Sequence, residues 1–353
     1  LIMRYIVVFT LSFLALVSAA QSATVWTPED SASPEVVLTS VVGPDAFVPT
    51  GAMPAVNMAL VPAPAAGYSE LRLQKAHEGA EAISDSPDEH GVFRLWCEFS
   101  HMLNDDPIVF PGGQNKSYLH TFFGNTGANY LSTSDSIKSS GNSTCFGGIA
   151  DRSAYWMPAM IDTATGTPLK PDHLLVYYRE GPASVIPNGL KMMAGVGVLR
   201  ATSVFDSRKR NSWFECNEVY DGHKDNIHTC DNGGRLTMAV AFPECWNGKD
   251  LDSPDHKSHM AYAKKKECPA AYPVKLPQIT MIAHYLVTTD AGTTNWRLSS
   301  DMYPKYGQNG GYSAHAGFMY GWDDAIHKTY VDNCINKSLD CHANLLGDGN
   351  WLY

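Results

Sequence analysis

Apolar and polar residues alternate along several short stretches of this 353-residue chain, and residues 279–287 show the pattern most clearly. The odd-numbered positions of this stretch are all apolar, whereas Ile282 and Leu286 fall on the opposite face beside Thr280 and His284. Successive side chains of a β-strand point to opposite faces of its sheet. The pattern therefore predicts a central strand that is covered on both faces, as in a sandwich.

Two further apolar runs, Leu174–Tyr178 and Leu236–Phe242, have the length and the residue types of strands. From Val92 onward, such runs alternate with Gly, Pro, Asn and Asp, which is typical of strand-rich domains. We predict a mostly β (α+β) domain with a β-sandwich-like fold and a few short helices.

One helix is predicted near the C-terminal end of the domain. Trp322, Ile326, Tyr330 and Cys334 recur every four residues, which places them on one helical face. Asp323-Asp324 at the start of this run suits a helix N-terminus, because a carboxylate there is favoured by the helix dipole. We expect this aromatic face to pack onto the sheet.

The first residues have the form of a secretory signal peptide: Met3-Arg4, the apolar run Ile6–Val17, and small residues up to Ala20. We expect cleavage after Ala20 and a secreted, extracellular protein. Residues 21–90 are rich in Pro and Ala without a sustained period, which indicates an arm or linker whose parts can also pair as edge strands. Residues 91–353 are expected to form one domain. No later run approaches the roughly 20 apolar residues of a membrane span.

The chain contains eight cysteines, and all of them follow the predicted signal peptide. An even number in an oxidising compartment predicts disulfides, here four, rather than thiol chemistry. Cys334 and Cys341 are near enough in sequence to close a small loop, and the other pairings stay open. No Cys-x-x-Cys pair is present, which argues against a zinc finger or a redox motif.

The formal net charge is -10, which argues against a nucleic-acid partner, since such proteins usually carry a basic face. Three Asn-x-Ser/Thr triplets, at Asn115, Asn142 and Asn336, predict a glycoprotein in a host that glycosylates secreted chains. The chain has no nucleophile elbow, Walker loop, dinucleotide fingerprint or His-Glu-x-x-His helix. Esterase, nucleotide-dependent and zinc-protease activities are therefore disfavoured.

A series of short motifs extends over roughly residues 91–345. The motifs are Phe93–Cys97, Phe99–His101, Asp105–Val109, His120–Asn125, Ser153–Trp156, Leu251–Tyr262 (LDSPDHKSHMAY) and His315–Asp323 (HAGFMYGWD). In this combination and order they resemble a family of secreted fungal and bacterial proteins known only as a domain of unknown function.

Members of that family are often fused to carbohydrate-binding modules, so the resemblance implies work on cell-wall or biomass polysaccharide. The family commonly has a histidine two residues before the one that matches His120. Here that residue is Tyr118, so a His-x-His metal chelate is not available in this chain.

His120 and Phe122 share one face of a predicted strand, so His120 can line a groove floored by aromatic rings, which often hold sugars. The alternative is a core histidine that is hydrogen-bonded to backbone. A buried pair is likewise the alternative for Tyr155 and Trp156. The predicted substrate-binding residues are Phe122, Tyr118, Asn125, Tyr155, Trp156 and Trp322.

Asp105 and Asp106 are adjacent, and adjacent residues of an extended segment point to opposite faces. Pro107 further restricts Asp106 to an extended conformation. We therefore do not expect these two to be the facing carboxylates, about 5 to 9 Å apart, that glycoside hydrolysis usually requires. An Asx-type turn is the alternative for residues 104–107.

Four more histidines lie in the motifs, namely His101, His256, His259 and His315. If folding brings them to His120, the group can form a metal-free acid/base site or a transition-metal site. Three hypotheses remain: a glycoside-hydrolase-like enzyme, a histidine-coordinated metal enzyme that can be oxidative, and a non-catalytic glycan-binding or wall-associated protein.

The first hypothesis is favoured. In it, His120 and one acid transfer protons while further histidines orient substrate or water. The predicted catalytic residues are His120, Asp105, Asp106, Asp323, His101, His259 and His315, with Asp301 and Glu98 as other acids near the motifs.

Overall fold

A computed structural model provides the structure of the protein and describes residues 53–77, 83–86, 90–195, 199–200, 211–217, 223–302 and 309–353. The predicted signal peptide and the first part of the predicted arm, residues 1–52, lie outside the described residues. No helix in the described part of the chain is long and apolar enough to cross a membrane.

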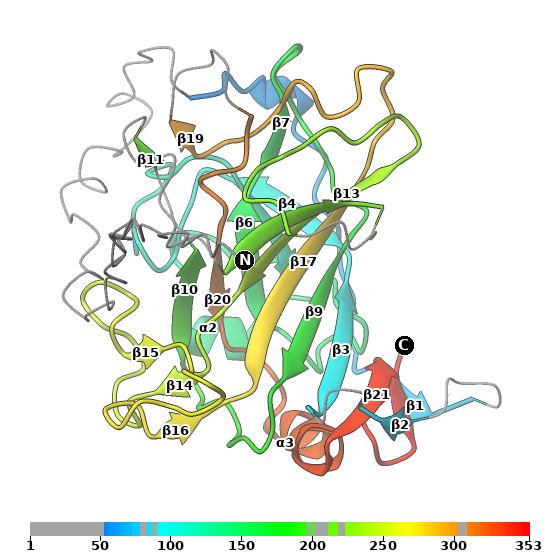
Figure 1. Ribbon diagram of the computed structural model, residues 1–353, viewed down its shortest axis with the longest axis vertical. Helices are drawn as coiled ribbons and strands as arrows, with labels where there is room; N and C mark the ends of the chain where they lie inside the picture. Colours follow the sequence, from blue (N-terminus) through cyan, green and yellow to red (C-terminus); the bar gives the residue numbers. More distant parts are fainter. Residues whose placement is uncertain are drawn as a thin grey trace, which may run out of the picture. The chain divides into compact units, whose positions relative to one another are not determined.

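The large sheet has seven strands and contains the three that the sequence predicts most clearly. Across the sheet the order is β12 (Ser212–Cys216), β13 (Arg235–Ala241), β17 (Gln278–Leu286), β9 (His173–Arg179), β3 (Val92–Cys97), β21 (Leu339–Ala343) and β2 (Ser84–Asp85). β13, β17 and β9 are antiparallel neighbours (Figure 1). The three predicted strands are therefore confirmed.

Both faces of β17 are covered along most of its length. Its odd-numbered residues are buried in the core, and Thr280 and His284 on the opposite face are buried as well, whereas Leu286 at the end of the strand is 47% exposed. On this outer face, neighbouring strands stack their rings side by side, as Trp96, His173 and His284 do.

The small sheet has five strands, all antiparallel, and lies behind the large sheet in Figure 1. Its order is β10 (Lys191–Gly195), β20 (His315–Met319), β6 (Ala154–Pro158), β5 (His120–Gly124) and β4 (Phe99–Leu103). Phe123, Tyr155 and Phe318 from this sheet share one apolar core with Phe93 and Met281 from the large sheet. The mostly β, sandwich-like fold is as predicted.

Short pairings surround the two sheets. They are β1 (Leu73–Lys75) with β22 (Asn350–Leu352), β11 (Leu199–Arg200) with β19 (Asp301–Met302), β14 (Cys245–Trp246) with β15 (Met260–Ala261) and β16 (Val274–Lys275), and β7 (Met160–Asp162) with β8 (Thr167–Pro168) and β18 (Trp296–Leu298). The described parts of the predicted arm include β1, which pairs with β22, and β2, which lies at an edge of the large sheet.

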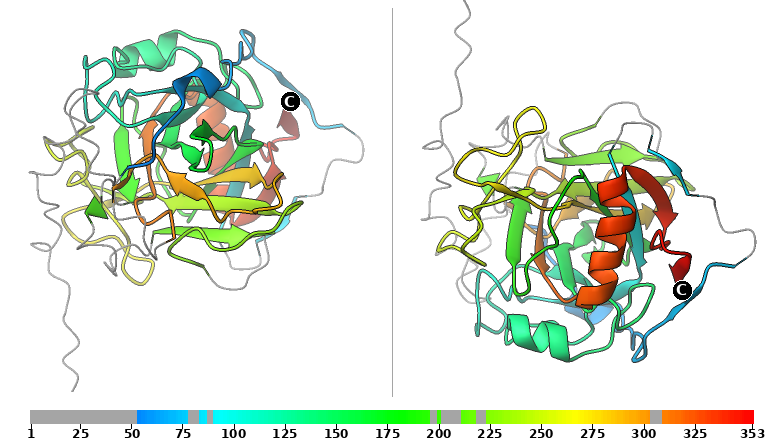
Figure 2. Two further views of the ribbon diagram at one scale, coloured as in Figure 1. Left: turned by 90° about the horizontal axis from the view of Figure 1, so that it is seen from above. Right: turned by 90° about the horizontal axis from the view of Figure 1, so that it is seen from below.

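The predicted helix is confirmed as α3 (Asp324–Asn333). The Asp323 side chain accepts hydrogen bonds from the N–H groups of Ala325 and Ile326 and so caps the first turn. Tyr330 stacks on Phe93 of β3 with ring centroids 4.1 Å apart, so the aromatic face meets the core as expected. Seen from below in Figure 2, α3 lies in front of the strands. The other helical segments are α2 (Ser134–Ser139), η2 (Met58–Leu60) and η4 (Ile335–Lys337).

All eight cysteines are paired, which confirms the predicted four disulfides, including the small C-terminal loop. The bonds are Cys97–Cys145, Cys216–Cys230, Cys245–Cys268 and Cys334–Cys341. No thiol is therefore left for nucleophilic or metal chemistry.

Candidate functional site

Several predicted site residues lie on the outer face of the small sheet, which is turned away from the large sheet. Phe122 and Trp156 belong there to a separate apolar cluster, whereas their chain neighbours Phe123 and Tyr155 point into the main core. Because strand residues alternate between faces, His120 lies on the same outer face as Phe122. This face carries the candidate site.

The register of three strands brings His120 and His315 together. His120 in β5 pairs with Pro158 in β6, and Gly317 in β20 pairs with Trp156 on the other side of β6. Continuing that antiparallel register places His315 level with Pro158. The two histidines therefore flank β6 and reach over it toward each other.

We call these residues the His120–His315 pair. Their Nε2 atoms are 3.3 Å apart, and the Tyr118 hydroxyl lies 2.8 Å from His315 Nε2. His120 is 0% and His315 1% exposed, whereas Tyr118 is partly exposed. Tyr118 is thus the member of the group that borders solvent.

Backbone carbonyls fix the orientation of both rings. His120 Nδ1 is 2.9 Å from the Asp105 oxygen, and His315 Nδ1 is 2.8 Å from the Ser313 oxygen. A carbonyl oxygen can only accept, so each Nδ1 carries the proton that it donates. In the neutral rings, both Nε2 atoms then present lone pairs toward the same point.

Burial keeps both imidazoles uncharged at neutral pH. It lowers the pKa of His120 to about 4, although the hydrogen bond to Asp105 acts in the opposite direction. The pKa of His315 is lowered to about 3, first by burial and then by the neighbouring His120. Neither ring gains a positive charge that would resolve the close approach of the two nitrogens.

Asp106 lies next to this group but is held by other partners. Its Oδ1 accepts hydrogen bonds from the N–H groups of Ile108 and Val109, and its Oδ2 accepts one from Trp156 Nε1 at 3.2 Å. The first two bonds form the Asx-type turn that was one alternative for this motif. Burial raises the pKa of Asp106, and these hydrogen bonds oppose the shift.

Asp105 points elsewhere, as expected for adjacent residues. Its two carboxylate oxygens accept from the N–H groups of Asn115 and Tyr130. Asp105 thus organises the loop that covers the site, and its backbone oxygen holds His120. The two aspartates do not face each other as a pair of hydrolytic carboxylates.

The aromatic residues near the pair form its floor rather than an exposed platform. Phe122 and Trp156 are fully buried and stack on each other with centroids 5.7 Å apart. Gly317 makes room for the Trp156 ring, because a Cβ atom there would lie 2.1 Å from it. In this structure neither ring offers a face to a sugar.

His101 is separated from the pair by Phe122, on which it stacks with centroids 4.8 Å apart. Its ring nitrogens contact the Ser100 hydroxyl and the Ala128 oxygen, both at 2.8 Å. Burial lowers the pKa of His101. The residue also lines an open depression of about 320 Å³ formed by residues 61, 62, 64, 101–103 and 126–129.

The motif Leu251–Tyr262 is a loop, not a helix, up to the short strand β15. His259 contacts the Ser253 hydroxyl and the Lys191 oxygen, and His256 contacts Asp252. Neither histidine has a described contact with the His120–His315 pair.

The same loop supplies a residue that the sequence analysis missed. Lys257 Nζ donates a hydrogen bond to the Gly195 oxygen at 3.0 Å, and Gly195 pairs with His315. The Lys257 ammonium further lowers the pKa of His315, whereas Asp106 acts in the opposite direction. Its position within the motif Leu251–Tyr262 is the signal that the sequence offers for it.

The remaining candidates have structural contacts. Asp323 caps α3, and Asn125 donates to the backbone oxygens of residues 137, 140 and 152. Asp301 is buried and accepts hydrogen bonds from Leu298, Gly311 and Ser313, and Glu98 bonds Thr144 through its backbone. Catalytic roles for Asp323, Asp301 and Glu98 and substrate binding by Asn125 stay predictions.

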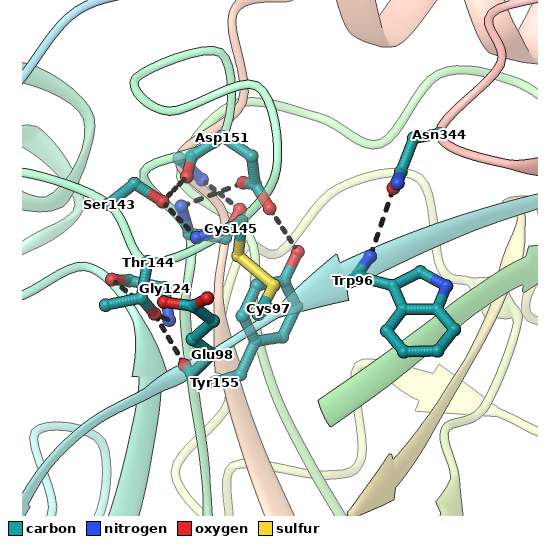
Figure 3. The surroundings of a disulfide bond; sticks show 12 residues. Trp96, Cys97, Glu98, Gly124, Ser143, Thr144, Cys145, Asp151, Tyr155 and Asn344 are labelled. Atoms are coloured by element: carbon teal, nitrogen blue, oxygen red, sulfur yellow. Dashed lines mark hydrogen bonds between the residues drawn. A yellow bond between two sulfur atoms is a disulfide. The ribbon is translucent and has the colours of Figure 1, made fainter. Parts of the chain in front are cut away.

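A second buried polar group, the Asp151 network, consists of Asp151, Tyr155, Tyr178 and Trp322. Figure 3 shows Asp151 and Tyr155 beside the Cys97–Cys145 disulfide. Tyr155 Oη donates to Asp151 Oδ2 at 2.7 Å and lies 2.6 Å from Tyr178 Oη, and Trp322 Nε1 donates to Tyr178 Oη at 2.9 Å. Tyr155 and Trp322, two predicted substrate-binding residues, therefore belong to the core.

In the described part of the chain, one group of three His, Cys, Asp or Glu ligand atoms lies within 4.8 Å, and it comprises Cys97, Cys145 and Asp151. The two sulfur atoms form a disulfide, so they offer no thiolate to a metal. The His120–His315 pair is not among such groups because the third polar atom beside its two nitrogens is the hydroxyl oxygen of a tyrosine.

Fold and site together define a disulfide-bonded β-sandwich with a buried histidine pair on the outer face of one sheet. The family model of a domain of unknown function (DUF1996) matches residues 106–322. The chain belongs to this family. No curated protein matches it, and no solved structure does either.

Proposed function

We propose that this protein is a secreted enzyme that cleaves cell-wall or biomass polysaccharide, with its reaction centre at the His120–His315 pair and Tyr118. One observation carries the proposal: two imidazoles that are 195 residues apart in sequence meet at 3.3 Å beside a tyrosine hydroxyl. Such groups exchange protons with water and substrates. Secretion is supported by the four disulfides.

In this proposal, the His120–His315 pair activates the water molecule that attacks the glycosidic bond. Asp105 and Asp106 accept hydrogen bonds from backbone N–H groups and do not face each other. They therefore do not form the pair of facing carboxylates that glycosidases usually use. The lone pair of His315 Nε2 lies 2.8 Å from the hydroxyl of Tyr118, which is partly exposed. Tyr118 is the side chain through which substrate would approach.

The nearby depression supports binding of a sugar chain. It measures about 320 Å³, which is within the range of small-ligand sites, and apolar residues such as Pro62, Met102 and Ala128 line it. His101 connects it to the site through its stacking on Phe122. A sugar unit here would lie beside the reaction centre rather than on it.

The test is incubation of the purified protein with glucans, xylan and chitin, followed by analysis of released oligosaccharides. We expect product with at least one polymer, and a rate at least about 100-fold lower for His315→Gln, which removes a proton-exchanging group. His173→Gln is the matched control, because His173 lies on the outer face of the large sheet and should leave the rate unchanged. Binding without product from any polymer would favour the non-catalytic glycan-binding alternative.

A further inference from the structure

We infer that the His120–His315 pair and Tyr118 bind one divalent transition-metal ion of the zinc or copper class. This inference deepens the proposed function and rests on it only for the role of the ion in catalysis. Metal binding itself requires no substrate.

The first argument is the orientation of the two rings. Each Nδ1 donates its proton to a backbone oxygen, so neither Nε2 of the neutral rings has a proton to share. The contact of 3.3 Å between them is therefore not a hydrogen bond but an approach of two acceptors. Tyr118 can donate to His315, whereas the described contacts of His120 Nε2 include no donor. Burying an acceptor in this way costs free energy unless something binds it.

The second argument is the separation of the nitrogens. Zinc binds histidine nitrogens at about 2.0 to 2.1 Å in tetrahedral geometry, so two such ligands lie about 3.3 Å apart. The observed separation of the Nε2 atoms is 3.3 Å. The two Nε2 atoms therefore have the separation expected of two histidine ligands of one zinc ion.

The third argument is the support behind each ring. Metal-binding histidines usually donate their other N–H to a carbonyl or carboxylate, which fixes the ring and leaves the lone pair for the metal. The oxygens of Asp105 and Ser313 have this role here. Both are anchored in turn, since the Asp105 carboxylate holds Asn115 and the buried Asp301 holds Ser313.

The ligand types identify the class of ion. Two imidazole nitrogens suit zinc and copper, whereas calcium and magnesium prefer sites built from oxygen ligands. The Tyr118 oxygen, 2.8 Å from His315 Nε2, is the third donor. A bound ion would supply acidity to a coordinated water, which gives the site a means of hydrolysis without a facing pair of carboxylates.

The experiment titrates chelator-treated, tag-free protein with zinc chloride and, separately, with copper sulfate by calorimetry. We expect one ion per molecule for at least one of the two metals. His120→Gln and His315→Gln should each weaken binding at least about 100-fold, and Tyr118→Phe about 10-fold. Tyr118→His should strengthen it, because it places a third imidazole where the Tyr118 side chain reaches His315.

His173→Gln is the matched control, since His173 also belongs to an imidazole pair, but one whose rings stack at 4.2 Å between centroids. It should not change affinity. Copper electron paramagnetic resonance of the unmodified protein adds a readout that no folding defect affects, with splitting from two nitrogen ligands expected. Absence of stoichiometric binding of both metals, or binding that survives both His120→Gln and His315→Gln in folded protein, overturns the inference.

The two proposals fail differently. Stoichiometric metal binding without polysaccharide cleavage would overturn the proposed function and leave the metal site standing. Full cleavage by chelator-treated protein without bound metal would overturn the role of the ion in catalysis and leave the proposed enzymatic function intact, whereas the titration alone decides whether the site binds metal.

Discussion

Two buried polar groups lie on opposite faces of the small sheet, and their hydrogen bonds differ in kind. In the Asp151 network on the inner face, donors meet acceptors: Tyr155 donates to Asp151, and Trp322 donates to Tyr178. In the His120–His315 pair on the outer face, two acceptors approach each other at 3.3 Å. Both groups are sealed from solvent, so burial alone does not distinguish them.

A third buried histidine sharpens the contrast. His327 in α3 accepts a hydrogen bond at Nε2 from the Ile186 N–H at 2.8 Å, and its Nδ1 lies 2.6 Å from the Tyr330 hydroxyl. One ring nitrogen accepts and the other is free to donate, as a neutral imidazole requires. Complementary bonding of this kind holds His327 in the core, whereas in the His120–His315 pair the described contacts of His120 Nε2 include no donor, which is the position that the inferred metal ion would occupy.

The largest effect on the free energy of unfolding is expected when a hydrogen-bonding group of the Asp151 network is removed. Tyr178→Phe removes one hydroxyl, which leaves Trp322 Nε1 without its partner and Tyr155 Oη with Asp151 as its remaining partner. Since a stranded polar group costs about 1 to 3 kcal/mol and a lost hydrogen bond about 1 kcal/mol, the free energy of unfolding should fall by roughly 3 kcal/mol. Urea denaturation measures it.

Tyr177→Phe is the control for this change. Tyr177 is the next residue in β9, and its partly exposed side chain lies over the outer face beside Arg94. A loss of less than about 1 kcal/mol is expected, as for most surface substitutions. If both variants lost the same free energy of unfolding, the Asp151 network would contribute no more to stability than a surface hydroxyl does.

The second prediction uses the carboxyl group of the network. Burial raises the pKa of Asp151 from 3.8 to about 6, so the folded protein binds this proton more tightly than the unfolded chain does. The stabilising contribution is fully present below pH 3.8 and is lost as the pH rises through 6. The loss amounts to roughly 3 kcal/mol at most.

Asp151→Asn removes this titration. Urea denaturation of both proteins at pH 4 and pH 7 should therefore show the variant gaining stability relative to the parent as the pH rises. A difference between the two proteins that is independent of pH would show that Asp151 titrates alike in the folded and unfolded states.

The smallest effect on the free energy of unfolding is expected from a substitution in the His120–His315 pair. In metal-free protein, His120→Leu removes one of two facing lone pairs but also strands the Asp105 oxygen, which costs about 1 kcal/mol. The net change in the free energy of unfolding should stay below about 1 kcal/mol. If His120→Leu lowered the free energy of unfolding as much as Tyr178→Phe does, the His120–His315 pair would stabilise the fold in the same way as the Asp151 network. The two groups would then not differ as described above.

Much of the fold could be predicted because its signals are local. The alternation in residues 279–287 is a property of one strand, and the recurrence of Trp322, Ile326 and Tyr330 is a property of one helix. The even number of cysteines likewise predicted disulfides. The alternation predicted cover on both faces of β17, but it did not say that rings of neighbouring strands form the outer cover, because that depends on residues distant in sequence.

The candidate site could be predicted only in part. His120, His315 and Tyr118 were named from motifs, but so were His101, His256 and His259, which have other partners. Lys257 lies in the same motif as His256 and His259, but a lysine in a charged loop is usually solvated, so the sequence did not single it out. Nothing in the motifs separated the residues that meet from those that do not.

The sequence by itself determined strand and helix positions, the disulfide content and a pool of histidines, because these depend on neighbours along the chain. The tertiary structure alone decided that His120 and His315 meet, since this depends on β5 and β20 flanking β6 in one register. It also decided which ring nitrogens carry protons, through the carbonyls of Asp105 and Ser313. A shift of either strand by one residue would turn its histidine to the opposite face of the sheet and abolish the site.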